Sequence, residues 1–300
     1  MRKPSYPASK SDNLSKTSEF LYSILKRCVL CGWRCKVNRF SQKGRCNSGV
    51  EVKISSFGPH SGEERIISGF AGSGTIFFTN CSMSCVFCQN YEISQLHQGY
   101  NVSEEELADI MLNLQNQGCH NINFVTPTHY LPQIYRSGVI AIEKGLSIPF
   151  VYNCGGYENP EIIKKLIGFI DIYMPDIKYG DNKTGEKYSG IPDYCDNCFP
   201  SVIEMKKQVG DITLDKNGIA EKGLLVRHLI LPDNIENSKN VLKFIKENLG
   251  ENTWISLLKQ YHPEFKAFKF PEINRFLRFE EYEEICEYAE KIGLKKVIFQ

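Results

Sequence analysis

The 300-residue chain is nearly neutral, with 36 Lys and Arg residues against 35 Asp and Glu residues and a formal net charge of +1. A chain of this length buries about three quarters of its unfolded surface, so it can fold as one large domain without disulfide bonds. The charge balance excludes a global basic field for nucleic acid, and no run of about 18 apolar residues predicts a membrane span. Residues 1–16 lack the apolar core of a signal peptide, so we expect a cytoplasmic protein without nucleic-acid or membrane partners.

The chain is expected to divide into three segments. Residues 1–20 are polar, include Pro4 and Pro7, and are predicted to form a flexible leader. Residues 21–70 are rich in cysteine and are predicted to form a metal-binding module and a linker. Residues 71–300 alternate short apolar runs with amphipathic stretches and are predicted to form the main domain.

A first cysteine array lies in the 21–70 segment, where Cys28, Cys31, Cys35 and Cys46 have the spacing C-x2-C-x3-C-x10-C. Four thiolates close a structural zinc site, and four also ligate every iron of a [4Fe-4S] cluster. The spacing does not choose between these two metals, and buried free thiols are the alternative to both. Without a secretion signal, the 12 cysteines of the chain favour metal ligands and buried thiols over a disulfide framework.

A second array, Cys81, Cys85 and Cys88, follows the apolar run GTIFFT with the spacing C-x3-C-x2-C. At this cysteine content chance alone supplies about 0.02 such triplets, so the spacing is informative. Three thiolates leave one iron of a [4Fe-4S] cluster without a protein ligand, and an open position is typical of a catalytic metal site. The alternative is a buried cysteine cluster or a zinc knuckle.

Six apolar runs from Gly74 onward are predicted to be strands, and amphipathic stretches between and after them are predicted to be helices. Ser103 and Glu106 form a capping box at the start of the first helix. The alternation is typical of a parallel sheet covered by helices, and six units are too few for a full eight-unit barrel of about 250 residues. The predicted fold class is therefore α/β, an open partial (β/α)6 TIM-like barrel with an N-terminal cysteine-rich metal-binding module. The strands are residues 74–79, 121–126, 149–154, 171–178, 224–231 and 254–260, and the helices are residues 103–117, 158–169, 238–250 and 280–293.

Polar residues follow the second and third predicted strands, where the chemistry of such barrels is located. The Thr126 and Thr128 hydroxyls could bind a ligand, or they could belong to a polar turn around Pro127. Asn153 can donate hydrogen bonds, and Gly155 lets backbone approach a ligand closely.

Charged residues follow in the fourth and fifth predicted strands. Asp176 and Lys178 are two residues apart and point the same way, so they can face one cavity and bind a zwitterion, or form a rim salt bridge with each other. Arg227 and His228 point to opposite faces, and we expect Arg227 to face the interior. There it would bind a carboxylate of a ligand or form a structural ion pair.

The triplet spacing, with aromatic Phe87 before the last cysteine, resembles the signature of the radical S-adenosylmethionine (radical SAM) superfamily. The resemblance implies a partial barrel and a [4Fe-4S] cluster on Cys81, Cys85 and Cys88 whose open iron is chelated by S-adenosylmethionine (SAM). It also implies reductive cleavage of SAM to a 5'-deoxyadenosyl radical that abstracts a substrate hydrogen. The candidate cofactor-binding residues are Phe87, Thr126, Thr128, Asn153, Gly155, Asp176, Lys178 and Arg227.

Several longer segments resemble one family within this superfamily, which is related to the pyruvate formate-lyase (glycyl-radical enzyme) activating enzymes and shares the four-cysteine module. The resemblance runs from about Cys28 to the C-terminus and includes the D-x-K sequence at residues 176–178, which resembles the activases. The segments are HSGEERIISGFAGSGTIFFTNCSMSCVFCQN, NFVTPTHY, YNCGGY, DIYMPDIKY, VRHLILP and LLKQYHP.

Three functions remain open at this point. The first is a radical SAM enzyme that acts on a peptide or protein, including an activase that removes hydrogen from a backbone glycine. The second applies the same radical chemistry to a small metabolite, and the third is a non-catalytic iron-sulfur protein for electron transfer or scaffolding. Both enzyme hypotheses imply an electron donor such as flavodoxin or ferredoxin. At the four-cysteine module the sequence leaves zinc and a second iron-sulfur cluster open.

Overall fold

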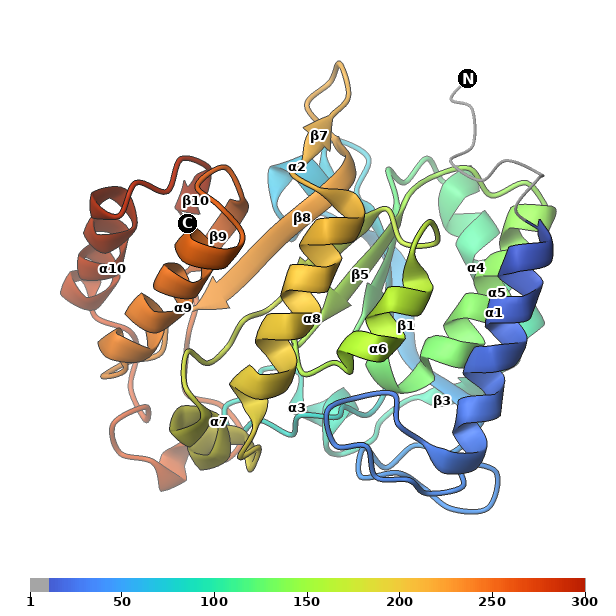
Figure 1. The fold of residues 1–300 in the computed structure, drawn as a ribbon, viewed down its shortest axis with the longest axis horizontal. Helices are drawn as coiled ribbons and strands as arrows, with labels where there is room; N and C mark the ends of the chain where they lie inside the picture. The colour runs from blue at the N-terminus through green and yellow to red at the C-terminus, as the bar shows by residue number, and fades with distance from the viewer. Residues whose placement is uncertain (1–10, 300) are drawn as a thin grey trace.

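The computed structural model describes residues 11–299, in which a run of parallel strands forms the middle of one sheet (Figure 1). Each of these strands pairs in parallel with the next one, as βαβ connections require. The central strands β5 and β6 are buried along their whole length, which explains their continuous apolar sequence. The parallel strands are β2 (Ser73–Phe78), β4 (Ile122–Val125), β5 (Phe150–Cys154), β6 (Ile172–Pro175), β8 (Ala220–Leu229), β9 (Trp254–Leu258) and β10 (Val297–Phe299).

Three antiparallel strands extend this sheet. β1 (Val52–His60) pairs with β2 on one side and with β3 (Tyr100–Val102) on the other, and β7 (Thr213–Leu214) pairs with β8. The full order is β10-β9-β8-β6-β5-β4-β2-β1-β3, with β7 off this path. Residues 52–60 were expected to lie in the linker of the 21–70 segment, so the sheet extends upstream of residue 71.

The six predicted strands are all confirmed, as β2, β4, β5, β6, β8 and β9, each shifted by a few residues at most at its ends. The predicted α/β class with an open, mostly parallel sheet is confirmed with them. β10 was not predicted because its three residues are too short to give a clear pattern. β1 was not predicted because Gly58 and Pro59 interrupt its apolar alternation.

Helices connect the strands, and three of the four predicted helices are confirmed with shifted ends. The capping box of α4 is present, because Ser103 Oγ accepts from the Glu106 N–H at 3.1 Å and Glu106 Oε2 accepts from the Ser103 N–H at 2.7 Å. No helix in residues 11–299 combines the length and the apolar character needed to cross a membrane. The longer helices are α1 (Ser11–Ile24), α4 (Glu104–Asn116), α5 (Leu131–Glu143), α7 (Asn182–Ser189), α8 (Tyr194–Val209), α9 (Ile235–Asn248) and α10 (Phe279–Lys291).

Short helical turns complete the described chain. The helix predicted over residues 158–169 is reduced to two of these turns, because Pro160 fixes the start and Gly168, with φ of 75°, ends the segment. The short α-helices are α2 (Arg65–Ser68), α3 (Tyr91–Ser94) and α6 (Pro160–Ile163), and the 3-10 turns are η2 (Leu25–Arg27), η3 (Thr128–Tyr130), η4 (Lys164–Leu166) and η5 (Ala267–Lys269).

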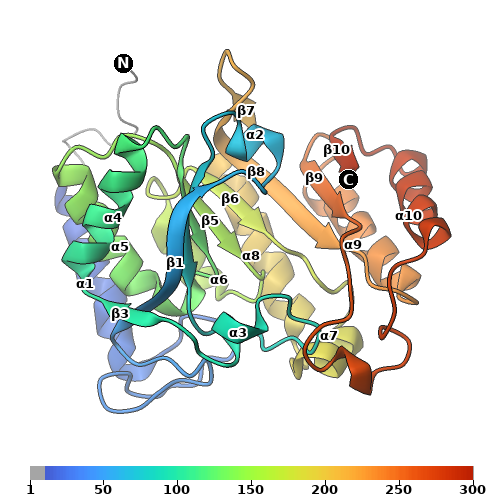
Figure 2. The same cartoon turned by 180° about the vertical axis from the view of Figure 1, so that it is seen from behind.

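The helices and the loops have separate places around the sheet. Helices α5, α6, α8 and α9 cover one face, and β1 crosses in front of the other (Figures 1 and 2). The loop of residues 28–50, drawn in blue, lies with α3 and α7 at the edge to which β8 points (Figure 1). Sites formed after the parallel strands therefore lie at the same edge as the first cysteine array.

The beginning of the described chain is helical. The predicted leader of residues 1–20 lies partly outside the described residues, and from Ser11 onward the chain forms α1. Leu21 of α1 and Leu25 of the following turn η2 are completely buried, so this helical segment is anchored in the main hydrophobic core. The guanidinium of Arg136 on α5 stacks on the ring of Tyr22 at 3.4 Å and holds the two helices together.

Candidate functional site

The cysteine triplet lies on a loop that begins directly after β2 and is tightly hydrogen-bonded. The Met83 N–H donates to Cys81 Sγ at 3.3 Å, and the Val86 N–H donates to the Tyr188 carbonyl at 2.8 Å. Ser84 adopts a φ of 57°, a left-handed conformation that turns the chain between the first two cysteines. These contacts fix the loop around the three thiols.

The three thiols of this loop interact with one another. Burial raises the pKa of Cys81 to about 12, and the neighbouring Cys85 and Cys88 contribute to that rise. Burial and then Cys85 also raise the pKa of Cys88. The three sulfurs therefore face a common space, as ligands of one cluster must.

Hydroxyl groups contact two of these sulfurs. Ser189 Oγ, at the end of α7, donates to Cys85 Sγ at 3.0 Å and lies 2.6 Å from the Tyr179 hydroxyl. Ser94 Oγ, at the end of α3, lies 3.3 Å from Cys88 Sγ. A donor to a thiolate sulfur stabilises its negative charge, so these hydroxyls are placed to adjust the electronics of a bound cluster.

A cavity of about 400 Å³ opens beside the triplet, and its wall includes all three cysteines. The cavity brings together most of the residues that the sequence singled out, although they come from five different strands or their ends. Apart from the cysteines, those lining it are Phe87, Thr126, Asn153, Gly155, Asp176, Lys178 and Arg227.

Asp176 and Lys178 follow β6 and form an ion pair inside this cavity, with Lys178 Nζ 2.6 Å from Asp176 Oδ2. Burial alone would raise the pKa of Asp176, but Lys178 and Arg227 lower it overall. Burial alone would lower the pKa of Lys178, but the Asp176 carboxylate raises it overall. The pair is therefore charged, and Asp176 Oδ1 is buried without a hydrogen-bond partner. This oxygen can accept a hydrogen bond from a ligand.

Arg227 faces the cavity, and its guanidinium is engaged by two carboxylates from the segment before β2. Arg227 Nε donates to Glu64 Oε1 at 2.9 Å, and Arg227 Nη2 also pairs with Glu63 and Glu64. His228 points the other way, where its Nδ1–H donates to the Ile177 carbonyl at 2.7 Å and Ser238 contacts its Nε2. The prediction that Arg227 binds a cofactor carboxylate remains a prediction, since protein carboxylates satisfy its charge here.

Thr128 does not line the cavity. Its hydroxyl donates to Glu158 Oε1 at 2.6 Å, and Tyr152 donates to Glu158 Oε2 at 3.0 Å. Burial raises the pKa of Glu158 to about 7, against the opposing effect of these two hydrogen bonds. The role of Thr128 as a cofactor ligand therefore remains a prediction, and the position of its side chain does not support it.

Sequence reasoning gave no role to two residues that help to shape the cavity. Glu63 lines it and joins Arg227 to Asn123, whose Nδ2 donates to Glu63 Oε1 at 2.8 Å. Met83 lines it from within the triplet loop, and its Sδ would clash with any Cβ at position 155. Glycine at position 155 thus leaves room for the Met83 side chain of the triplet loop. The HSGEER sequence contains Glu63 and was the one local pattern that could have identified it. Its partner Arg227 lies 164 residues away in the sequence.

The four cysteines of the first array gather in a separate lobe, residues 28–50, which we call the cysteine lobe. Burial and then Cys46 raise the pKa of Cys31, and burial raises that of Cys28 with a further contribution from Cys35. A methyl group at Gly44 would lie 3.3 Å from Cys46 Sγ and 3.7 Å from Cys35 Sγ. Each of the four sulfurs therefore lies within interaction range of at least one other. In residues 11–299 no three His, Cys, Asp or Glu side chains are grouped as ligands of a single metal ion.

Arg39 is buried inside this lobe, with 2% of its surface exposed. Its guanidinium donates to the Gly49 carbonyl at 2.7 Å, to the His129 carbonyl at 3.1 Å and to Cys28 Sγ at 3.7 Å. None of the ion pairs in the described part of the chain involves it. A buried cation beside thiols is stabilised if those thiols carry negative charge, as metal ligands do.

The cysteine lobe contacts the triplet loop directly. Trp33 Nε1 donates to the carbonyl of Ser82, which lies between the first two cysteines of the triplet, at 2.7 Å. The guanidinium of Arg45 stacks on one face of Trp33 at 3.6 Å, and Tyr157 meets the ring edge-on. The lobe therefore helps to hold the triplet loop in place.

The residues of the cavity fit the cofactors that the resemblance implies. Three thiols line one wall and supply three of the four cysteine ligands that a fully ligated [4Fe-4S] cluster has. Asp176 Oδ1 is an unpartnered acceptor of the kind that the ammonium group of SAM requires. The absence of a side chain at Gly155 leaves room for Met83 Sδ, which would clash with a Cβ at this position.

Comparison with known proteins agrees with this geometry. The family model described as the radical SAM superfamily matches residues 75–198, which include the triplet and the Asp176–Lys178 pair. The uncharacterised protein MJ0674 of Methanocaldococcus jannaschii is 32% identical over 295 residues, which cover 95% of this chain and 80% of that protein. MJ0808 of the same organism is 27% identical over 198 residues, which cover 64% of this chain and 53% of that protein.

Among solved structures, Streptococcus suis SuiB bound to its precursor peptide SuiA has a similar fold. It superposes with a TM-score of 0.51 at 12% identity, over 74% of this chain and 47% of SuiB, so this chain spans about half the length of SuiB. At this identity the similarity concerns the fold. Together with the extended match to MJ0674 and the radical SAM family match, the geometry leads to one assignment: the chain belongs to the radical SAM superfamily, which implies a [4Fe-4S] cluster and SAM as cofactors.

Proposed function

We propose that this protein is a radical SAM enzyme that abstracts a hydrogen atom from a peptide or protein. The observation that carries the proposal is the cavity that three thiols, the Asp176–Lys178 ion pair and Gly155 line together. When bound, the [4Fe-4S] cluster and SAM supply a 5'-deoxyadenosyl radical by one-electron cleavage of the sulfonium. The residues of the chain bind, orient and enclose these groups.

Each cavity residue has a proposed part in holding the cofactors. Cys81, Cys85 and Cys88 ligate the cluster, and Asp176 accepts a hydrogen bond from the SAM ammonium group. Lys178 keeps Asp176 charged, because their ion pair favours the carboxylate. The remaining contacts to SAM are assigned to Thr126, Asn153 and the backbone at Gly155, with Phe87 as apolar packing and Arg227 as a further carboxylate ligand.

A peptide or protein substrate is favoured by the segment that follows Gln260 on the cavity wall. The Lys266 N–H donates to the Val86 carbonyl of the triplet loop at 2.8 Å, and Phe265 stacks on Tyr91. The same segment leaves Phe268 63% exposed and Phe276 71% exposed. Exposed aromatic side chains provide an apolar surface suited to a peptide, and the Lys266 contact to Val86 ties their segment to the triplet loop. The fold neighbour SuiB binds a precursor peptide, which agrees with this choice.

The role of Asp176 is tested by the variant Asp176→Asn, with exposed Asp109→Asn on α4 as the control. Loss of a charged acceptor for an ammonium group is expected to weaken SAM binding by about 1.5–3 kcal/mol, or roughly tenfold to hundredfold. Calorimetric titration of SAM into the reconstituted proteins measures this change. Equal affinities for the two variants would remove Asp176 from the SAM site.

The substrate class is tested with two deuterated fractions from cells grown in D2O, one of proteins and peptides and one of small metabolites. Reduced, reconstituted protein is mixed with SAM and each fraction, and deuterium in the released 5'-deoxyadenosine is measured by mass spectrometry. We expect deuterium from the protein fraction, and less of it with the variant Phe268→Ser/Phe276→Ser. Deuterium from the metabolite fraction alone would favour the metabolite hypothesis, and no release of 5'-deoxyadenosine would favour a non-catalytic iron-sulfur protein.

We also propose that the four thiols of the cysteine lobe bind a metal, either zinc or a second iron-sulfur cluster. Their mutual proximity and the buried charge of Arg39 support a site with net negative charge. Metal analysis with Mössbauer spectroscopy of anaerobically purified protein distinguishes the two. Stoichiometric zinc with about four irons indicates a structural lobe, and about eight irons without zinc indicates a second cluster. Iron for the triplet alone without zinc would exclude a lobe metal.

A further inference from the structure

The charge of the chain is concentrated in and around the cysteine lobe. Residues 26–50 contain seven Lys and Arg residues and no Asp or Glu. The chain as a whole has a net charge of +1, so the remaining residues carry −6. The overall neutrality therefore conceals a strongly basic segment on an otherwise acidic protein.

Most of this basic charge is on the surface. Arg39 is buried, whereas the other six cations of residues 26–50 are exposed. None of the ion pairs in the described part of the chain includes one of these six. Unpaired exposed cations in the cysteine lobe and directly before it generate a positive potential that extends about 10 Å into solution at moderate salt. The exposed cations are Lys26, Arg27, Arg34, Lys36, Lys43 and Arg45.

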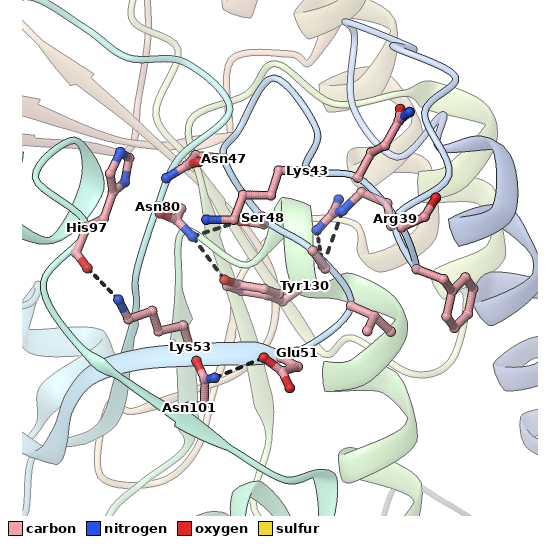
Figure 3. Close-up of a pocket in the computed structure, with 15 residues that line it drawn as sticks. Arg39, Lys43, Asn47, Ser48, Glu51, Lys53, Asn80, His97, Asn101 and Tyr130 are labelled. Atoms are coloured by element: carbon pink, nitrogen blue, oxygen red, sulfur yellow. Dashed lines mark hydrogen bonds between the residues drawn. The ribbon is translucent and has the colours of Figure 1, made fainter.

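A polar pocket of about 480 Å³ lies between the lobe and strands β1 and β3 (Figure 3). Lys43 of the lobe and Lys53 of β1 line it, together with amide groups such as that of Asn47. Burial and then these two lysines lower the pKa of His97 on the same pocket, which indicates a positive potential there. Glu51 is the pocket's one carboxylate in the described chain, and it accepts a hydrogen bond from Asn101. The pocket is therefore a recess suited to carboxylate side chains.

The lobe is also close to the cluster ligands. Trp33 joins it to the Ser82 carbonyl inside the triplet loop, at 2.7 Å. A protein bound to the lobe would thus lie near the place where the proposed reaction takes up an electron. None of the four lobe cysteines lines the basic pocket, so a partner there need not displace a lobe metal.

We infer that the basic surface of residues 26–53 is the docking site for an acidic electron-donor protein, of the flavodoxin or ferredoxin class. The inference rests on the proposed function, because only a reductive reaction requires such a partner. The donor gives up one electron and this protein takes up one electron in each reductive event. Charge complementarity selects the partner, since acidic side chains of the donor face Lys26, Lys36 and Lys43 and enter the pocket beside Lys53.

The test compares two triple charge reversals of equal size. The lobe variant is Lys26→Glu/Lys36→Glu/Lys43→Glu, and the control is Lys207→Glu/Lys216→Glu/Lys222→Glu. The control residues are also exposed, and they lie at the end of α8 and on the β7–β8 hairpin, at the edge opposite the lobe (Figure 1). None of the six substituted lysines lines the triplet cavity. Binding of labelled oxidised flavodoxin is measured by anisotropy, and reduction by flavodoxin hydroquinone is measured by stopped flow.

At low ionic strength we expect the lobe variant to have an affinity for flavodoxin and a rate of reduction by flavodoxin that are each about tenfold to hundredfold lower than those of the wild type. The difference should disappear near about 0.5 M salt. The control variant is expected to change either value less than threefold. Equal effects of the two variants would overturn the inference. The inference would also be overturned if the lobe lysines were needed for binding a nucleic-acid duplex but not for reduction by flavodoxin.

The same preparations separate this inference from the proposed function. Release of 5'-deoxyadenosine with dithionite as the reductant reports the proposed function without a protein donor. If dithionite supports release in all three proteins and flavodoxin reduces them equally, the docking site is wrong and the enzyme proposal stands. If dithionite supports no release in the wild type, the enzyme proposal fails, and the anisotropy data still decide whether the lobe binds the acidic protein.

Discussion

The triplet loop and the cysteine lobe place cysteines in two different surroundings. The three thiols of the loop line a cavity of about 400 Å³ that Asp176 also lines, and Asp176 Oδ1 is buried without a hydrogen-bond partner. The Cys35 and Cys46 thiols of the lobe lie beside Gly44, the Cys28 thiol accepts from Arg39, and none of the four lobe thiols lines either neighbouring cavity. The number of thiols and their access to a cavity therefore together distinguish a site that is open to a ligand from a closed site.

The two regions also differ in what stabilises negative charge on sulfur. In the triplet loop the contacts to sulfur come from neutral hydroxyls, because Ser189 donates to Cys85 Sγ and Ser94 Oγ lies 3.3 Å from Cys88 Sγ. In the lobe the donor is the buried guanidinium of Arg39, a full positive charge. Neutral donors can be changed without leaving a buried charge unpaired, whereas removal of Arg39 leaves the lobe with uncompensated thiolates. We therefore expect substitutions in the triplet loop to change function and substitutions in the cysteine lobe to change stability.

The largest expected effect is loss of SAM cleavage in the variant Cys85→Ala. Removal of one of three cluster ligands should reduce release of 5'-deoxyadenosine by at least about a thousandfold, or more than about 4 kcal/mol in the barrier. Cys119→Ala is the control, because Cys119 is buried outside both cysteine regions. Substantial release by the Cys85 variant would contradict the assignment of the triplet as the open site.

A second test addresses the lobe through Arg39→Gln. Removal of the buried cation should lower the free energy of unfolding by about 3 kcal/mol and speed the loss of lobe metal to a chelator. Cleavage of SAM per triplet cluster should change less than threefold. Denaturant titration and chelator kinetics measure the first two quantities. A selective loss of SAM cleavage with normal stability would reverse the division of roles between lobe and loop.

A third test uses pH, because each region is supported by a buried neutral histidine. His129 contacts Arg39 of the lobe through its carbonyl, and His228 contacts Ile177 behind the cavity. Burial lowers the pKa from 6.5 to about 3 for His129 and to about 4 for His228. Below pH 6.5 the unfolded chain binds protons that the folded chain excludes, so stability falls as pH falls from 6.5 toward 4.

At pH 5 each histidine should have lost about 2 kcal/mol of its contribution to stability relative to high pH. The variants His129→Asn and His228→Asn should each reduce the difference in unfolding free energy between pH 7 and pH 5 by this amount. The raised pKa of Glu158, about 7, acts in the opposite direction and is common to all three proteins. Denaturant midpoints at the two pH values measure the change, and an unaltered pH dependence would mean that the histidine is protonated in the fold.

Local patterns made much of this site predictable from the sequence. The six strands have apolar runs long enough to identify, and the triplet, Asp176 and Lys178 follow strand ends, where parallel sheets collect their ligands. The direction in which the Thr128 side chain points was not predictable, because its hydrogen-bond partner Glu158 lies beyond the next strand. The pairing of Arg227 with Glu63 and Glu64 was not predictable either, since it joins residues more than 160 positions apart. Contacts of this kind depend on the assembled sheet and leave no local pattern.

The smallest effect expected is a shift in cluster potential in the variant Ser189→Ala. The lost hydroxyl donates to Cys85 Sγ and stabilises the more negative, reduced state, so its removal should make the midpoint potential more negative. A hydrogen bond of about 1 kcal/mol corresponds to at most about 40 mV for one electron, because only the difference in its strength between the two redox states shifts the potential. Redox titration followed by electron paramagnetic resonance measures the shift, and Ser201→Ala, a buried serine on α8 without a hydrogen-bond partner, is the matched control. An unchanged potential would mean that the triplet is insensitive to a neutral donor, and the contrast between the two regions would then rest on Arg39 alone.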